Sequence, residues 1–135
     1  MKVLILLLIS ISSYSKPIKV TQVQDLEFGI LVQGDSSKII PPNSNNPNSA
    51  VFDVTGDKNT SYSILLPTQM SISLNGSGSN PIIINNFKSV PAAGANGLLD
   101  KKGRQTIGIG ATLTSINVTQ PPGNYFGTFT VDVIY

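Results

Sequence analysis

The chain has 135 residues, of which 40% are hydrophobic, and nine lysines and arginines against seven acids give a formal net charge of +2. It contains no histidine, cysteine or tryptophan, which excludes disulfide bonds, thiolate chemistry and an imidazole base or metal ligand. The only local basic run is Lys101, Lys102 and Arg104, which is typical of a solvated loop, so nucleic acid is not indicated as a partner.

The N-terminus has the pattern of a leader. A positive start at Lys2 is followed by an apolar run over residues 3–11 and then by small residues two apart. The alternative, an N-terminal membrane anchor, is disfavoured because the run is well short of the roughly 20 residues that span a bilayer. The sequence therefore predicts a signal peptide over residues 1–15 and one exported domain over residues 16–135, with no membrane span after the signal is removed.

After the leader, period-2 alternation recurs, and no stretch keeps a helical period for more than one turn. Many short strands separated by turn-forming clusters are typical of an all-β fold, a mostly antiparallel β-sandwich. In chain order, the residues expected to alternate along strands are Leu26, Phe28, Ile30 and Val32, then Phe52 and Val54, then Tyr62, Ile64 and Leu66, then Met70, Ile72 and Leu74, then residues 82–84 with Phe87, and finally Ile107, Ile109, Ala111 and Leu113.

Two kinds of interruption stand out between these strands. Residues 41–49 and 89–103 are long polar segments that we expect to be loops without a fold of their own. Gly108 and Gly110 lie on one face of a predicted strand, opposite its isoleucines. A strand without side chains on one face indicates a bend, or a place where another backbone passes close by.

The last predicted strand, residues 125–135, alternates between apolar and polar side chains to the final residue. Thr128, Thr130 and Asp132 would face one side. Such a strand is either a structural strand of the sandwich or an edge offered to a partner. The residues on the apolar side, which form the candidate interaction edge, are Tyr125, Gly127, Phe129, Val131, Val133 and Tyr135.

Three motifs occur in the order seen in one bacterial family. Residues 26–30 resemble an L-x-F-G opening, and residues 52–56 with 60–67 resemble an F-x-V-x-G and Y-x-I-x-L-P block. Residues 122–135 resemble the ending G-x-Y-x-G-x-F-x-V-x-V-x-Y. The chain thus resembles an uncharacterised family of secreted bacterial domains related to chaperone–usher pilins and spore-coat U domains.

This resemblance implies an immunoglobulin-like, pilin-like sandwich that is one strand short, secreted or held at the cell surface or in the periplasm of a Gram-negative bacterium. In such pilins a periplasmic chaperone lends the missing strand, and the N-terminal extension of the next subunit later replaces it. The candidate donor segment here is residues 16–24, with Ile18, Val20 and Val23. Its pattern slips register after Thr21, so it is either a poor donor or the first strand of a self-complete domain.

Carboxylates supply the remaining candidates for chemistry. Asp25 and Glu27 would share a strand face, either as a carboxylate pair or cation site or simply as outward residues beside apolar ones. Asp53 and Asp57 flank a turn, but a calcium loop would show acids at alternate positions. We therefore predict no catalytic, cofactor-binding or metal site, no cofactor and no enzymatic activity; a small hydrolase is disfavoured by the missing histidine and cysteine.

The leading hypothesis is a non-catalytic exported structural subunit of a fimbria-like or surface-coat assembly. It would associate with itself or with a periplasmic chaperone by β-strand pairing along the candidate interaction edge. The alternative hypothesis is a monomeric secreted adhesin or binding module that uses the loops over residues 41–49 and 89–103.

Overall fold

A computed structural model describes residues 16–135, and the predicted signal peptide lies outside the described residues. Within that range the chain forms ten strands and no helix, so these residues contain no helical segment that could cross a membrane. The strands are β1 (Lys19–Gln24), β2 (Lys38–Ile40), β3 (Ala50–Thr55), β4 (Ser61–Leu65), β5 (Gln69–Leu74), β6 (Ile82–Val90), β7 (Gly94–Leu98), β8 (Arg104–Leu113), β9 (Tyr125–Phe126) and β10 (Asp132–Ile134).

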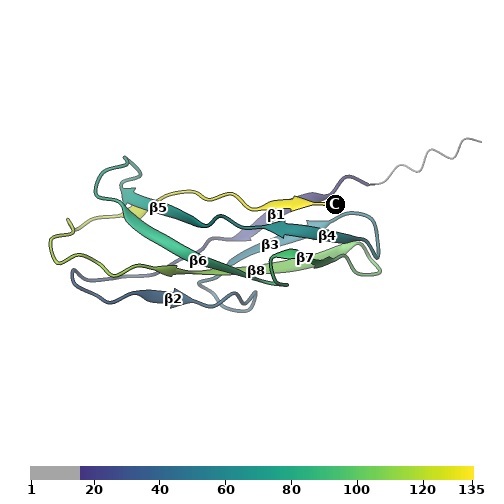
Figure 1. The fold of residues 1–135 in the computed structure, drawn as a ribbon, viewed down its shortest axis with the longest axis horizontal. Helices are drawn as coiled ribbons and strands as arrows, with labels where there is room; N and C mark the ends of the chain where they lie inside the picture. The colour runs from purple at the N-terminus through teal and green to yellow at the C-terminus, as the bar shows by residue number, and fades with distance from the viewer. Residues whose placement is uncertain (1–15) are drawn as a thin grey trace, which may run out of the picture.

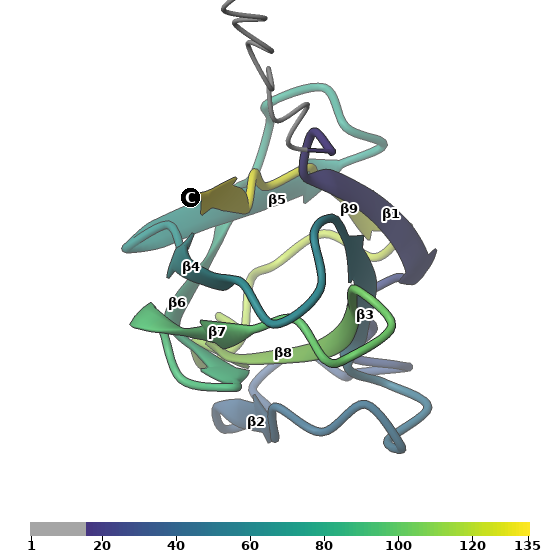
Figure 2. The same cartoon turned by 90° about the vertical axis from the view of Figure 1, so that its right-hand side faces the viewer.

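The strands form two antiparallel sheets (Figure 1). The first sheet has the order β1-β3-β8-β6-β5-β9, and β2 also pairs with the C-terminal part of β8. The second has the order β10-β4-β7. Figure 2 shows the first sheet curling from β1 through β3, β8 and β6 to β5, so that its two ends come round toward each other. The predicted all-β, antiparallel architecture is confirmed.

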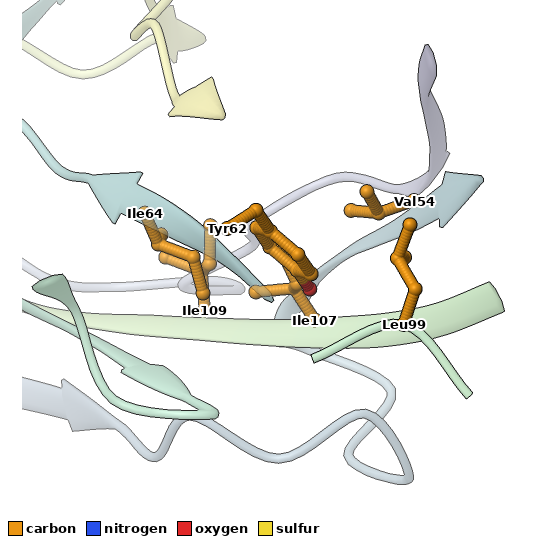
Figure 3. Packing of buried hydrophobic residues seen from close by; sticks show 7 residues of the cluster. Val54, Tyr62, Ile64, Leu99, Ile107 and Ile109 are labelled. Atoms are coloured by element: carbon orange, nitrogen blue, oxygen red, sulfur yellow. The ribbon is translucent and has the colours of Figure 1, made fainter. Parts of the chain in front are cut away.

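Two clusters of buried side chains form the core. The first joins both sheets, because Tyr62 and Ile64 of β4 pack against Ile107 and Ile109 of β8, together with Ala50, Val54 and Leu99 (Figure 3). The second cluster consists of Ile82, Ile84, Ala111, Leu113 and Ile116. Strand β8 contributes to both clusters, and each large aliphatic side chain buried this way contributes about 1.5–3 kcal/mol.

The glycines of β8 mark a close crossing of backbones, as predicted. A Cβ atom on Gly110 would lie 2.5 Å from the carbonyl carbon of Pro41, and one on Gly108 would lie 2.6 Å from the backbone nitrogen of Ser44. The segment that follows β2 therefore lies directly on the face of β8 that is opposite Ile107 and Ile109. This contact buries both faces of β8, which is why its residues from 107 to 111 are all buried.

Residues 41–49 are held against the sheet rather than extended into solvent. Ser49 is buried and its hydroxyl donates to the carbonyl of Pro41. The side-chain amide of Gln24 donates to the carbonyls of Asn46 and Ser49, at 2.8 and 2.6 Å. This polar segment is a loop, as expected, and it covers one face of the first sheet.

The expectation that residues 89–103 are a loop is wrong. Strand β6 extends to Val90, and β7 pairs antiparallel with β4. The strand escaped the sequence pattern because its inward position is a glycine: a Cβ atom on Gly97 would overlap the ring of Tyr62. Only residues 91–93, between β6 and β7, and residues 99–103, which lead into β8, remain loops in the expected sense.

The side chain of Tyr62 is buried among apolar residues, with 2% of its surface exposed, and its hydroxyl donates to the Oε1 atom of Gln105. Burial disfavours the charged tyrosinate and raises the pKa of Tyr62 to about 12. The stabilisation that follows from this shift is fully present below the unfolded pKa of about 10. It is lost as the pH rises through that value toward the folded pKa.

Ultraviolet titration of tyrosinate absorbance tests this assignment. We expect a late ionisation step near pH 12, and Tyr62→Phe to remove that step. Titration of every tyrosine in one step, with the protein still folded, would contradict the burial of Tyr62.

Substitution of Gly110 tests the backbone crossing over β8. Gly110→Ala places a methyl group against the backbone after β2, and we expect it to lower the free energy of unfolding by about 1–3 kcal/mol. Thr112→Ala, two residues along the same strand, is the matched control and should have the smaller effect. Urea unfolding of both variants measures the difference. Equal losses of unfolding free energy would mean that the backbone of residues 40–42 does not contact Gly110.

Candidate functional site: an open apolar groove

The two ends of the curled first sheet leave an opening, and a groove of about 980 Å³ lies there. We call it the open groove. Its first wall is residues 25–33, and its second wall is residues 120–129. Its floor consists of apolar side chains from four strands and the segment after β8, namely Ala50, Phe52, Met70, Ile72, Ile82, Ile84, Leu113 and Ile116.

The floor is part of the protein's own core. Ile82, Ile84, Leu113 and Ile116 belong to the second core cluster, and Ala50 belongs to the first. The opening therefore reaches the interior of the fold instead of forming a shallow surface depression. These five side chains are buried, whereas Phe52, Met70 and Ile72 of the floor keep part of their surface accessible. Such apolar surface favours the binding of another apolar group.

The first wall differs from its prediction. Residues 25–33 form no strand, and although Leu26 and Phe28 point inward, Ile30 is 99% and Val32 is 68% exposed. Leu31 packs against the second core cluster in their place. The cause is Gly29, whose φ of 76° is in the left-handed region and shifts the alternation by one residue.

The backbone of the first wall is held on the side facing residues 41–49. The amide of Glu27 donates to the carbonyl of Asn48 at 2.9 Å, and Nζ of Lys38 donates to the carbonyl of Phe28 at 2.6 Å. Across the groove, the first wall and the second wall are not paired as strands in the described chain. The side chain of Gln33 in the first wall donates to the carbonyl of Gln120 in the second, so a hydrogen bond links the walls without forming a strand ladder.

The second wall is the start of the C-terminal segment, and it is not the uninterrupted strand that was expected. Strand β9 pairs with β5 through Tyr125 and Phe126, residues 127–131 form no strand, and β10 then pairs with β4. The segment crosses from the first sheet to the second over these five residues. Because it serves two sheets in turn, it cannot keep a single ladder along its whole length.

Only part of the candidate interaction edge lies at the groove. Tyr125, Gly127 and Phe129 line it, and the ring of Phe129 lies 5.1 Å from the ring of Phe87. Val131 and Val133 do not line the groove and pack against the first core cluster, as Phe129 also does. Tyr135 is half exposed, and its hydroxyl reaches the carbonyl of Lys16, at the far end of β1.

The candidate donor segment is folded into its own chain. Strand β1 pairs antiparallel with β3, with Val20 opposite Val54. The predicted slip of register is confirmed, since the pairing shifts between Gln22 and Gln24 and leaves Val23 58% exposed. Ile18 packs against the first core cluster. In this structure the segment behaves as the first strand of the domain.

The carboxylate pairs are not brought together with other ligands. Asp25 and Glu27 lie on the rim of the groove, where Asp25 accepts a hydrogen bond from the side chain of Gln22. Asp53 accepts from the hydroxyl of Thr106 at 2.9 Å, and Asp57 accepts from the backbone of Lys16. Within residues 16–135, no three or more acids, histidines or cysteines converge as a metal site would require.

The segment between β8 and β9 closes one end of the groove, which the sequence pattern did not indicate. The hydroxyl of Tyr125 donates to the carbonyl of Pro121 at 2.6 Å and accepts from the side chain of Gln120 at 3.1 Å. Gln120 also donates to the carbonyl of Asn80, at 2.7 Å. The sequence did contain a signal for this closure. Tyr125 lies four residues after Pro121, a spacing at which its hydroxyl can fold back onto the turn.

Comparison with curated proteins and with solved structures finds no match. A family model does match, and it covers residues 18–135, from the residue before β1 to the last residue of the chain. The match includes both walls and the floor of the open groove. The protein therefore belongs to the family described as "Domain of unknown function (DUF4402)".

Proposed function

We propose that this protein is a non-catalytic structural subunit that is exported by a Gram-negative bacterium and assembles at the cell surface, as a component of a fimbria-like fibre or coat. Its subunits associate by β-strand addition, in which an extended segment of one partner fills the open groove of another. The observation that carries this proposal is the groove itself, whose apolar floor lies between two walls that form no strand ladder with each other within the described residues.

An extended segment suits this groove better than a compact ligand does. A β-strand presents every second side chain to one face, so it can cover the floor while its backbone pairs with the walls. The groove volume of about 980 Å³ is at the upper end of the range of about 300–1,000 Å³ for small-molecule sites. Backbone pairing also explains why an assembly of this kind needs no reactive side chain.

The resemblance to chaperone–usher pilins and spore-coat U domains supports the same proposal. In those domains an immunoglobulin-like sandwich lacks one strand, and a chaperone or a neighbouring subunit supplies it. A signal peptide over residues 1–15 would deliver the chain to the compartment where such assembly occurs. The gap between β1 and β9 is where the missing strand would lie in this protein.

Charge complementarity favours a second copy of this chain as the occupant. In the described lining, Asp25 and Glu27 are the charged residues, so the rim of the groove is acidic. The stretch that leads into β1 has Lys16 and Lys19 on either side of the apolar Ile18. Its basic and apolar side chains are complementary to an acidic rim and an apolar floor. A donated β1 would have to leave β3 of its own chain first.

A charged side chain in the second wall tests the groove as the assembly site. Phe129→Asp brings a carboxylate to the groove, and we expect it to weaken association at least about tenfold, which corresponds to about 1.4 kcal/mol. Thr130→Asp adds the same charge at the next exposed position, which does not line the groove, and is the matched control. Light scattering after size-exclusion chromatography measures the assembly, and circular dichroism confirms that both variants are folded. Normal assembly of folded Phe129→Asp would overturn the proposal.

A second candidate function is a monomeric binding module, and the pairing of β1 with β3 in the same chain is the observation that favours it. The expected binding loops give it less support than their length suggested. Residues 41–49 lie against β8, and residues 89–103 include β7.

A disulfide across β1 and β3 separates the two functions. Thr21 and Asp53 are direct partners in the ladder and both are exposed, so Thr21→Cys with Asp53→Cys can join them. The chain has no other cysteine. An assembling subunit that donates β1 should stay monomeric when oxidised and assemble when reduced. The same oligomeric size in both states would favour the module over the donor of β1.

A further inference from the structure

The first and last described residues meet at the turn between β3 and β4. Figure 1 shows the C-terminus beside the start of β1. The backbone nitrogen of Lys16 donates to Oδ1 of Asp57 at 3.0 Å, and the hydroxyl of Tyr135 donates to the carbonyl of Lys16 at 3.1 Å. The amide of Asp57 donates to the Tyr135 hydroxyl at 3.3 Å. These three hydrogen bonds close a ring.

The turn that carries this ring is supported from behind. Gly56 has no side chain, and a Cβ atom there would overlap the hydroxyl of Tyr135, so the phenol rests on the turn backbone. The amide of Gly56 donates to the carbonyl of Gly103 at 3.0 Å. That second turn is ordered by Asp100, whose carboxylate accepts the amides of Arg104 and Lys102, which lowers the pKa of Asp100. The ring therefore has a fixed base.

Strand β1 is held mainly by its ladder with β3 and, at its end, by the two hydrogen bonds of Gln24. It is an edge strand of the first sheet, and five of its six residues are exposed. Its ladder with β3 begins at Lys19 and loses register after Gln22. Because an edge strand opens from its ends, the contacts just before Lys19 decide how readily β1 separates from β3.

We propose that Lys16, Asp57 and Tyr135 form a latch that holds β1 in the sheet of its own chain, and that opening this latch controls how fast β1 becomes available to another copy. The consequence for assembly rests on the proposed function; the latch itself rests on the three hydrogen bonds. The latch also joins the residues just before β1 of the first sheet to the residue just after β10 of the second.

Removal of the predicted signal peptide would strengthen the latch. Cleavage after Ser15 converts the backbone nitrogen of Lys16 into an α-ammonium group, which would face the Asp57 carboxylate. The bond is already charge-assisted through the Asp57 carboxylate, and an ammonium donor would add the attraction of a second, opposite charge. Processing would then leave β1 held more firmly in its own chain until assembly begins.

Amide hydrogen exchange tests the latch without requiring assembly. Tyr135→Phe removes the hydroxyl but keeps the ring, and Asp57→Ala removes the carboxylate acceptor. We expect each variant to speed exchange in residues 19–24 by about 2- to 10-fold, the effect of losing about one net hydrogen bond. Exchange in residues 107–111 of β8 should not change. Asp132→Ala, which removes an exposed carboxylate from β10, is the matched control and should leave β1 unaffected.

The rate of self-association, followed by light scattering on the same proteins, separates the latch from the proposed function. Faster exchange in β1 together with faster association supports the proposed control. Unchanged exchange in residues 19–24 would overturn the latch, even if the protein assembles through its groove. Faster exchange in β1 with no gain in association would instead contradict the donation of β1, and with it the controlling role of the latch.

Discussion

The structure depends on the burial of an apolar core by a sheet that curls without closing. Strands β1 and β9 lie at the two ends of the first sheet, and the open groove between its walls leaves Phe52, Met70 and Ile72, which pack against the core, partly exposed. Burial of apolar surface is the main favourable term in folding, at about 25 cal/mol per Å², so such a gap favours a segment that covers it. The partly exposed floor and the walls without a strand ladder occur at the same place, which is the basis for proposing a strand as the occupant.

Strand β8 shows how the fold covers its other surfaces. Its isoleucines face the first core cluster, while Gly108 and Gly110 let the backbone after β2 rest on the opposite face. Residues 41–49 are then held by Gln24 and by the buried Ser49. This polar segment covers the outer face of the first sheet, and hydrogen bonds within the segment pair some of its backbone groups there. This face is closed within the chain, in contrast to the side with the open groove.

The two ends of the chain connect the core to the proposed assembly. Residues of the C-terminal segment line the groove at Tyr125 and Phe129 and reach the start of β1 at Tyr135. Strand β1 in turn occupies the edge of β3 in its own chain. Under the proposed function, such a domain would exist as a separate molecule and exchange β1 later. The balance between the two states would then depend on the latch contacts just before β1.

Sequence patterns alone determined the all-β, antiparallel class of the fold and much of the core. Alternation identified Val54, Tyr62, Ile64, Ile107 and Ile109 as inward residues, because a half-buried strand repeats every two residues whatever its neighbours are. The paired glycines of β8 also predicted a close backbone, since a missing side chain on one face has few other uses.

Tertiary structure decided the pairing of strands and the location of the groove. Gly29 reverses the facing of Ile30 and Val32, and Gly97 makes room for Tyr62, so a period-2 pattern could not place the first wall or reveal β7. The C-terminal stretch alternates like one strand, yet it pairs first with β5 and then with β4, and these two strands belong to different sheets. Local alternation reports which side chains are buried. It does not report which backbone lies alongside, because that depends on segments far away in the chain.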